Sequence, residues 1–145
     1  MMSNNADYII YTDGASKGNP GPSSVGVAIY DSAGVSLKDC FKAIGRATNN
    51  VAEYQAVIFA LKKIKALYGK KKAKESVVLI NSDSRLLVKQ LNGEFRLKDE
   101  KIKELFIDVW NEKMDFKKVL FNQIPREKNE RADALANQAF GGGLL

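Results

Sequence analysis

The sequence contains no histidine and a single cysteine, Cys40, among its 145 residues. These two shortages exclude an internal disulfide, a zinc site built from Cys and His ligands, and every catalytic pair in which imidazole activates a serine or a cysteine. Catalysis by this chain would therefore depend on carboxylates, lysines, hydroxyls, the one thiol or a bound hard metal ion.

Long apolar runs are also missing. No stretch approaches the roughly 20 apolar residues of a membrane-spanning helix, and residues 1–7 lack the basic and apolar regions of a signal peptide. We therefore expect a protein that has no membrane partner and is located in the cytoplasm. The 23 Lys and Arg residues exceed the 17 Asp and Glu residues and give a formal net charge of +6, which favours a polyanionic partner without identifying it.

Length and hydrophobic patterning together indicate one globular domain. We expect it over residues 7–140, between flexible ends at residues 1–6 and 141–145. Two of the three prolines fall within residues 15–24, which predicts a shaped loop there. Apolar residues at alternating positions predict strands, and those three and four residues apart predict helices. The expected strands are 8–12, 25–30, 35–44, 76–81 and 119–124, and the expected helices are 51–68, 84–91, 99–114 and 132–140.

This order of elements predicts an α/β fold of the α+β type, with a five-stranded mixed sheet flanked by helices. The first three strands should be antiparallel, and the strands reached through helices should be parallel. In the third helix we expect the buried face to include Phe106, Val109 and Trp110.

Four acidic residues stand at positions that suit a ligand site, although each also has a structural interpretation. Asp13 and Asp83 follow strands that should be neighbours, and ligand sites in such sheets favour the carboxyl ends of strands. Asp13 could instead belong to a turn, and Asp83 could cap a helix. Glu53 could form a capping box with Asn50, and Asp133 could stabilise a helix dipole.

The segments around these acids occur in a characteristic order. Thr12–Pro22, Thr48–Glu53, Asn81–Ser84 and Asn129–Asp133 together resemble the motifs of the type 1 ribonuclease H family. The resemblance covers residues 8–140, and the expected order of elements agrees with that family's fold. Neither a dinucleotide-binding G-x-G-x-x-G motif nor a P-loop is present.

The resemblance implies a metal-dependent endoribonuclease that hydrolyses the RNA strand of RNA–DNA hybrids and leaves 5′-phosphate and 3′-hydroxyl ends. Asp13, Glu53, Asp83 and Asp133 would be the catalytic residues and would hold two Mg²⁺ ions, with Mn²⁺ as a substitute. Clustered carboxylates repel one another unless divalent cations neutralise them, and a two-metal mechanism requires no histidine.

The resemblance also implies a set of contacts to the hybrid. Arg46 and Thr48 match a pocket for a phosphate of the DNA strand. For the asparagines, a turn or helix cap remains an alternative. The implied minor-groove contacts are Gly14, Ser16, Asn19, Asn49, Asn50 and Arg85.

Two departures from the family pattern affect these expectations. Some family members carry a basic, Trp-rich protrusion, but residues 92–100 are too short for one. The lysine-rich run 62–74 could supply the missing affinity for the hybrid. Double-stranded RNA could also be cleaved, because fewer contacts remain to discriminate between the strands. The connection before the last helix lacks a histidine, which leaves Glu127 as a candidate for proton transfer or product release. We expect a monomer. A non-catalytic module for hybrid binding or protein assembly is the alternative function.

Overall fold

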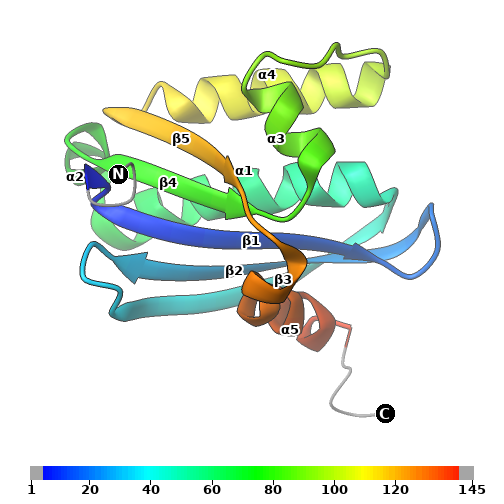
Figure 1. Ribbon diagram of the computed structural model, residues 1–145, viewed down its shortest axis with the longest axis horizontal. Coiled ribbons are helices and arrows are strands. Elements are labelled where there is room, and N and C mark those ends of the chain that lie inside the picture. The colour runs from blue at the N-terminus through cyan, green and yellow to red at the C-terminus, as the bar shows by residue number, and fades with distance from the viewer. Residues whose placement is uncertain (1–4, 141–145) are drawn as a thin grey trace.

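The computed structural model describes residues 5–140 and contains a single five-stranded sheet with helices on both faces (Figure 1). The strands lie in the order β3-β2-β1-β4-β5. The β1–β2 and β2–β3 pairs are antiparallel, whereas the β1–β4 and β4–β5 pairs are parallel, so the predicted mixed sheet is confirmed. The elements are β1 Tyr8–Ser16, β2 Gly21–Asp31, β3 Ser36–Ala47, α1 Asn49–Tyr68, α2 Lys70–Lys74, β4 Val77–Ser82, α3 Arg85–Leu91, α4 Glu100–Lys113, β5 Lys118–Gln123, a 3₁₀ turn Arg126–Lys128 and α5 Glu130–Gln138.

The main core lies between the sheet and α1. Alternate residues of the central strands, such as Ile10 and Val27, point toward this helix and are fully buried with its Tyr54 and Leu61. Helix α4 packs on α1, and α5 packs on the opposite face of the sheet against β1 and β2. The burial of both sheet faces explains why β4 is almost continuously apolar.

The loop expected at residues 15–24 is much shorter in the structure. β1 continues to Ser16 and β2 already begins at Gly21, so only residues 17–20 remain as the connection. The hydroxyls of Ser16 and Ser23 donate to the carbonyl of Ala47 at 3.0 and 3.1 Å and bind this end of the hairpin to β3. Proline is tolerated at the first residues of a strand, and this is where Pro22 lies.

The prediction for the third helix was wrong at Trp110. Ile102, Leu105 and Val109 are buried on one face of α4, but Trp110 is 55% exposed. It follows Val109 by one residue and is therefore rotated about 100° away from that face. The Lys113 ammonium lies 5.4 Å from the centre of the indole ring.

The expected flexible ends lie mostly outside the described residues. Within those residues, Ala6 is buried, and the N–H of Asp7 donates to the carbonyl of Val77 at 2.8 Å. No helix in the described part of the chain combines the length and apolarity that a bilayer crossing requires.

Candidate active site

The end of the parallel ladder between β1 and β4 brings two acids together. The parallel ladder between these strands ends at the pair Thr12 and Ser82, and Asp13 and Asp83 are the next residues of each chain segment. Glu53 reaches the same point from α1. One carboxylate oxygen from each of these three acids lies within 4.8 Å of the others, as the order of strands predicted for the two aspartates.

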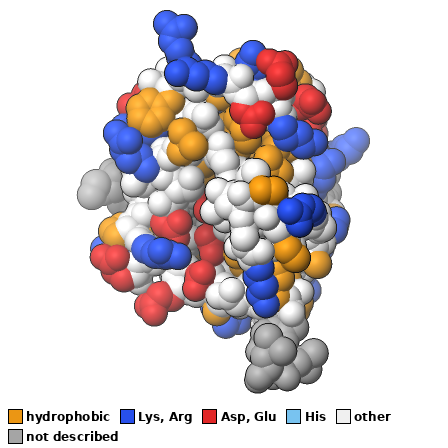
Figure 2. Space-filling model, turned by 90° about the vertical axis from the view of Figure 1, so that its right-hand side faces the viewer, with side chains coloured by type: hydrophobic (Ala, Val, Ile, Leu, Met, Phe, Trp, Pro, Cys, Tyr) orange, Lys and Arg blue, Asp and Glu red, His pale blue; other side chains and the backbone are white. Residues whose placement is uncertain are grey.

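Asp133 approaches from the first turn of α5 but lies outside the group of three whose oxygens are within 4.8 Å of one another. It lines a cavity of about 450 Å³ together with Asp13, Glu53 and Asp83. Figure 2 looks onto this end of the molecule and shows several acidic side chains gathered on one part of the surface. The four acids, which span 120 positions of sequence, therefore share one cavity.

The electrostatics of the cavity disfavour ionisation of all the acids at once. The pKa of Asp13 is raised to about 8, first by burial, then by the charge of Asp83 and by the hydrogen bond and charge of Asp133. The pKa of Glu53 is raised well above its ordinary value, mainly by burial and then by the charge of Asp13. A divalent cation would relieve this repulsion, and an all-carboxylate donor set suits Mg²⁺ or Mn²⁺.

Glu53 has a different partner from the one that local sequence suggested. The N-cap of α1 is Thr48, whose hydroxyl accepts from the N–H of Val51 at 3.2 Å, so the alternative of a capping box between Asn50 and Glu53 is excluded. The Glu53 carboxylate instead accepts a 2.9 Å hydrogen bond from the N–H of Gly14. This bond crosses from α1 to β1 and lowers the pKa of Glu53 against the larger effect of burial.

The capping alternative for Asp83 is also excluded. The N-cap of α3 is Ser84, whose hydroxyl accepts from the N–H of Leu87 at 3.2 Å. Asp83 is thus left to face the cavity, where one of its oxygens, Oδ2, accepts a 3.1 Å hydrogen bond from Asn129 Nδ2.

Asn129 and Arg126 are site residues that the sequence did not assign. Asn129 is 1% exposed, and its Nδ2 also donates to the carbonyl of Thr12 at 2.9 Å, so it joins the start of α5 to both central strands. Arg126 lines the acidic cavity, and its charge lowers the pKa values of Asp13 and Glu53. Asn129 lies in one of the motif segments, but only its tertiary contacts distinguish it from an ordinary helix cap.

The residues expected to contact the hybrid form two groups beside the acids. Gly14, Ser16 and Asn49 line the acidic cavity itself. The Asn19 side-chain oxygen accepts from the N–H of Asn49 at 2.9 Å and holds the loop 17–20 against the start of α1.

The second group lies next to a neighbouring cavity of about 540 Å³, which Asn50 and Phe95 help to line. The Arg85 guanidinium lies 5.0 Å from the centre of the Phe95 ring. Arg46 is exposed on β3, and Glu127 is exposed in the 3₁₀ turn, outside the set of residues that lines the acidic cavity.

Comparisons with known proteins agree with this geometry. A family model described as "Reverse transcriptase-like" matches residues 11–139. The chain is 39% identical over 130 residues to ribonuclease HI of Halobacterium salinarum, covering 90% of this chain and 62% of that protein. It is 34% identical over 145 residues to ribonuclease H of Pseudomonas entomophila, covering 89% and 90%. It spans only 35% of a bifunctional protein of Mycobacterium tuberculosis to which it is 36% identical over 133 residues.

Solved structures are similar over nearly the whole fold. LC11-RNase H1 in complex with an RNA/DNA hybrid is 41% identical with a TM-score of 0.87, covering 95% of this chain and 99% of that chain. RNase H1 of Halobacterium salinarum is 37% identical with a TM-score of 0.85, covering 93% and 98%. Shared sequence, shared fold and the four gathered acids together show that the chain belongs to the type 1 ribonuclease H family.

Proposed function

We propose that this protein is a metal-dependent endoribonuclease that hydrolyses the RNA strand of RNA–DNA hybrids. The observation that carries the proposal is the meeting of Asp13, Glu53, Asp83 and Asp133 in one cavity. Relatives that match along almost their whole length are named ribonuclease H, and one similar structure is a complex with an RNA/DNA hybrid, which supports the choice of substrate.

The four acids would hold two Mg²⁺ ions, with Mn²⁺ as a substitute. When bound, such an ion pair supplies the positive charge that activates an attacking water and stabilises the departing oxygen in an in-line displacement. Within the chain, the Gly14 N–H orients Glu53 and the Asn129 amide orients Asp83. The products would carry 5′-phosphate and 3′-hydroxyl ends.

Recognition of the hybrid would depend on its backbone and its 2′-hydroxyl groups rather than on base sequence. Gly14, Ser16, Asn19, Asn49, Asn50 and Arg85 would contact the minor groove, and Arg46 with Thr48 would bind a phosphate of the DNA strand. The short segment 92–100 places Phe95, Arg96 and Lys98 around the cavity that Asn50 lines, beside the acids Glu94 and Asp99. Phe95 and the two cations would contact the hybrid there without a longer protrusion. Binding should therefore weaken with added salt.

Three finer points complete the proposal. Double-stranded RNA would be a secondary substrate, because few contacts remain to discriminate the second strand. Glu127 is exposed and directly follows Arg126, which lines the acidic cavity. It would assist proton transfer or product release. The protein would act as a cytoplasmic monomer.

The test is cleavage of end-labelled RNA–DNA, RNA–RNA and DNA–DNA duplexes in Mg²⁺, Mn²⁺ or EDTA. Cleavage of the RNA strand of the hybrid in either metal, and none in EDTA, is the expected result. Asp13→Asn should abolish cleavage while hybrid binding remains, whereas Asp108→Asn, at an exposed position of α4, should cleave normally.

The alternative is a module that binds hybrids or assembles with proteins without catalysis. Such a module would shift the mobility of the hybrid in a gel yet leave it intact in every buffer. That outcome for the unmodified protein would reject the nuclease.

A further inference from the structure

A second cavity lies on the same face of the sheet as Asp13. In the β1–β2 register Asp13 pairs with Gly26, and Ile9 pairs with Tyr30. Alternate residues of a strand share a face, so Ile9, Tyr11 and Asp13 point the same way. Helix α5 covers this face at Gly26, where an added Cβ would lie 2.3 Å from the Ala132 carbonyl oxygen.

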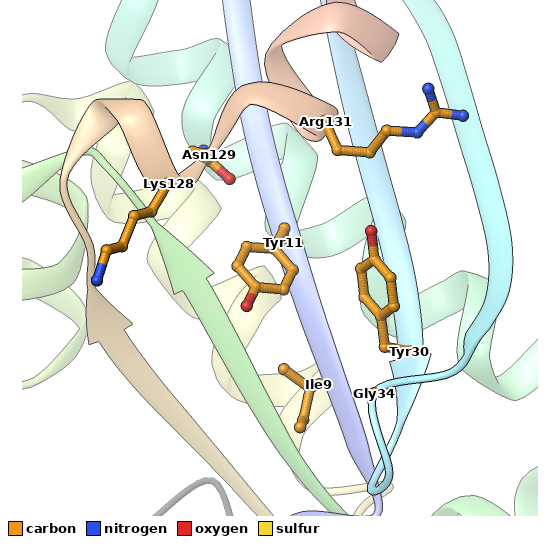
Figure 3. A pocket seen from close by; sticks show the side chains of 7 residues that line it. All are labelled: Ile9, Tyr11, Tyr30, Gly34, Lys128, Asn129 and Arg131. Carbon is orange, nitrogen blue, oxygen red and sulfur yellow. The ribbon is translucent and has the colours of Figure 1, made fainter.

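Beyond α5 the sheet is hollowed around Tyr11 and Tyr30 (Figure 3). The hollow has a volume of about 340 Å³. Two residues along a strand correspond to about 7 Å, so the Tyr11 position lies one such step from Asp13. The residues that line it are Ile9, Tyr11, Tyr30, Gly34, Lys128, Asn129 and Arg131.

Its walls are aromatic. The rings of Tyr11 and Tyr30 meet edge to face, with centroids 5.6 Å apart and planes at 87°. Ile9 adds an aliphatic surface beside them (Figure 3). Both rings are half-buried and line the open cavity, so they offer a surface on which a flat heterocycle can stack, because every base has an apolar face.

A buried hydrogen-bond acceptor lies at one end of this cavity. The Asn129 amide nitrogen is used by Thr12 and Asp83, but its Oδ1 is buried and has no hydrogen-bond partner among residues 5–140. In Figure 3 this oxygen points toward the Tyr11 side of the cavity. Buried carbonyl oxygens are nearly always paired, so an N–H donor from a ligand would satisfy it.

Two cations lie at the rim. Arg131 is held by Asp39, to which its Nε donates at 3.1 Å, so part of its charge is already neutralised. Lys128 is exposed and takes part in none of the ion pairs formed by the described residues. An anionic group attached to the stacked ring would find its counter-ion in Lys128.

We propose that this cavity binds one nucleotide, whose base stacks on the Tyr30 ring, meets the perpendicular Tyr11 ring edge to face and donates an exocyclic N–H to Asn129 Oδ1, while its phosphate lies beside Lys128. The nucleotide is either a free nucleoside 5′-monophosphate or the phosphorylated end of a single RNA strand. The site goes beyond the proposed nuclease activity and does not require it.

Isothermal titration of the full chain in EDTA tests the site without metal-dependent binding at the acids. Adenosine 5′-monophosphate should bind with a stoichiometry of one. Purine riboside 5′-monophosphate, which lacks only the amino group, should bind more weakly, and ribose 5-phosphate should bind at least tenfold more weakly. Equal affinity for adenosine monophosphate and ribose 5-phosphate, or no binding of the former at millimolar concentration, would overturn the proposal.

A 5′-phosphorylated RNA tetranucleotide distinguishes the two sources. Tighter binding of this oligonucleotide than of the mononucleotide, lost when its 5′-phosphate is removed, identifies a strand end. Equal affinities identify a free nucleotide.

Variants locate the bound nucleotide. Tyr30→Leu keeps apolar volume but loses the stacking surface, and should weaken binding by roughly fivefold to a hundredfold. Lys128→Gln should weaken binding of the monophosphate but not of adenosine. Lys101→Gln, which makes the same charge change at an exposed position of α4, should have no effect on either. Because Lys128 is exposed, Lys128→Gln should fold, and it tests the nucleotide site even if Tyr30→Leu fails to fold. Unchanged affinity of Lys128→Gln for the monophosphate would refute the assignment.

Asp13→Asn separates this proposal from the nuclease. The variant should lose hybrid cleavage and still bind the mononucleotide. Loss of mononucleotide binding in folded Asp13→Asn would show that the nucleotide occupies the acidic cavity instead.

Discussion

The Glu53 carboxylate accepts a 2.9 Å hydrogen bond from the backbone N–H of Gly14, and this bond joins α1 to β1 at the acidic cavity. The two backbones are close enough there that a Cβ on Gly14 would lie 2.3 Å from the Ala52 carbonyl carbon. The position of Glu53 relative to Asp13 therefore depends on the absence of a side chain at residue 14.

We predict that Gly14→Ala will destabilise the protein and abolish cleavage. The added methyl group meets backbone rather than a flexible side chain, so α1 must move away from β1, at a cost of about 3 kcal/mol in the free energy of unfolding. Urea denaturation measures the loss. Gly34→Ala is the matched control, since its φ of +83° costs only about 1 kcal/mol and no atom lies within 4 Å of the added carbon. Similar losses in the two variants would contradict the close-approach explanation.

Stability of the metal-free protein should fall as pH rises. The pKa of Asp13 is raised to about 8 in the folded state, mainly by burial, from an ordinary value of 3.8. The folded protein therefore binds more protons than the unfolded chain between these values, and stability decreases through this window as the pH increases. Thermal unfolding in EDTA at pH 5, 7 and 8.5 should show progressively lower midpoints.

Added Mg²⁺ should reverse that loss at the alkaline end, because it binds the ionised acids of the folded state. The variant Asp13→Asn should have a flatter pH dependence in EDTA. A midpoint that rises between pH 5 and 8.5 without metal would contradict the raised pKa of Asp13.

Arg126 should oppose metal binding. Its guanidinium lines the acidic cavity and lowers the pKa values of Asp13 and Glu53, so it supplies part of the positive charge that a cation would supply. Arg126→Gln is expected to bind Mg²⁺ more tightly, by a few-fold, in calorimetric titration. Lys103→Gln, which removes a charge at an exposed position of α4, should leave the titration unchanged. Weaker binding by Arg126→Gln would mean that the arginine organises the acids rather than competing for them.

The sheet and the meeting of Asp13 with Asp83 were predictable from the sequence. The parallel ladder between β1 and β4 ends at Thr12 and Ser82, so the acid that follows each of these residues lies near the other. The partner of Glu53 was not predictable, because the same carboxylate fits a local capping box and a tertiary bond to Gly14 equally well. Local pattern cannot decide between them, since the distance from α1 to β1 is set by packing.

Two predictions were wrong for a related reason. The length of the loop at residues 15–24 was overestimated, because Gly and Pro residues suggest breaks in a strand. The hydroxyls of Ser16 and Ser23 donate to the carbonyl of Ala47 on β3, more than 20 positions away in the sequence, and the local pattern does not reveal these contacts. Trp110 was assigned to the core because it follows the apolar Phe106 by four residues, the spacing of one helical face. Helix α4 has only α1 as its main packing partner, so a narrow stripe of its surface is buried and the indole falls outside it.

Asn129→Ala should lower both stability and activity, because this buried amide binds one carbonyl and one acid. Its removal leaves the Thr12 carbonyl without its side-chain donor and frees Asp83 to rotate. Loss of such a buried hydrogen-bonding group costs about 1–3 kcal/mol, which urea denaturation can measure. Asn122 is an exposed residue of β5 whose side chain donates to Asn81. The variant Asn122→Ala should lose less free energy of unfolding than Asn129→Ala and should leave cleavage intact. Because the acid itself remains, excess Mg²⁺ should restore part of the Asn129→Ala cleavage rate, whereas no excess should rescue Asp83→Ala. Equal failure of both variants at every Mg²⁺ concentration would mean that Asn129 does more than orient Asp83.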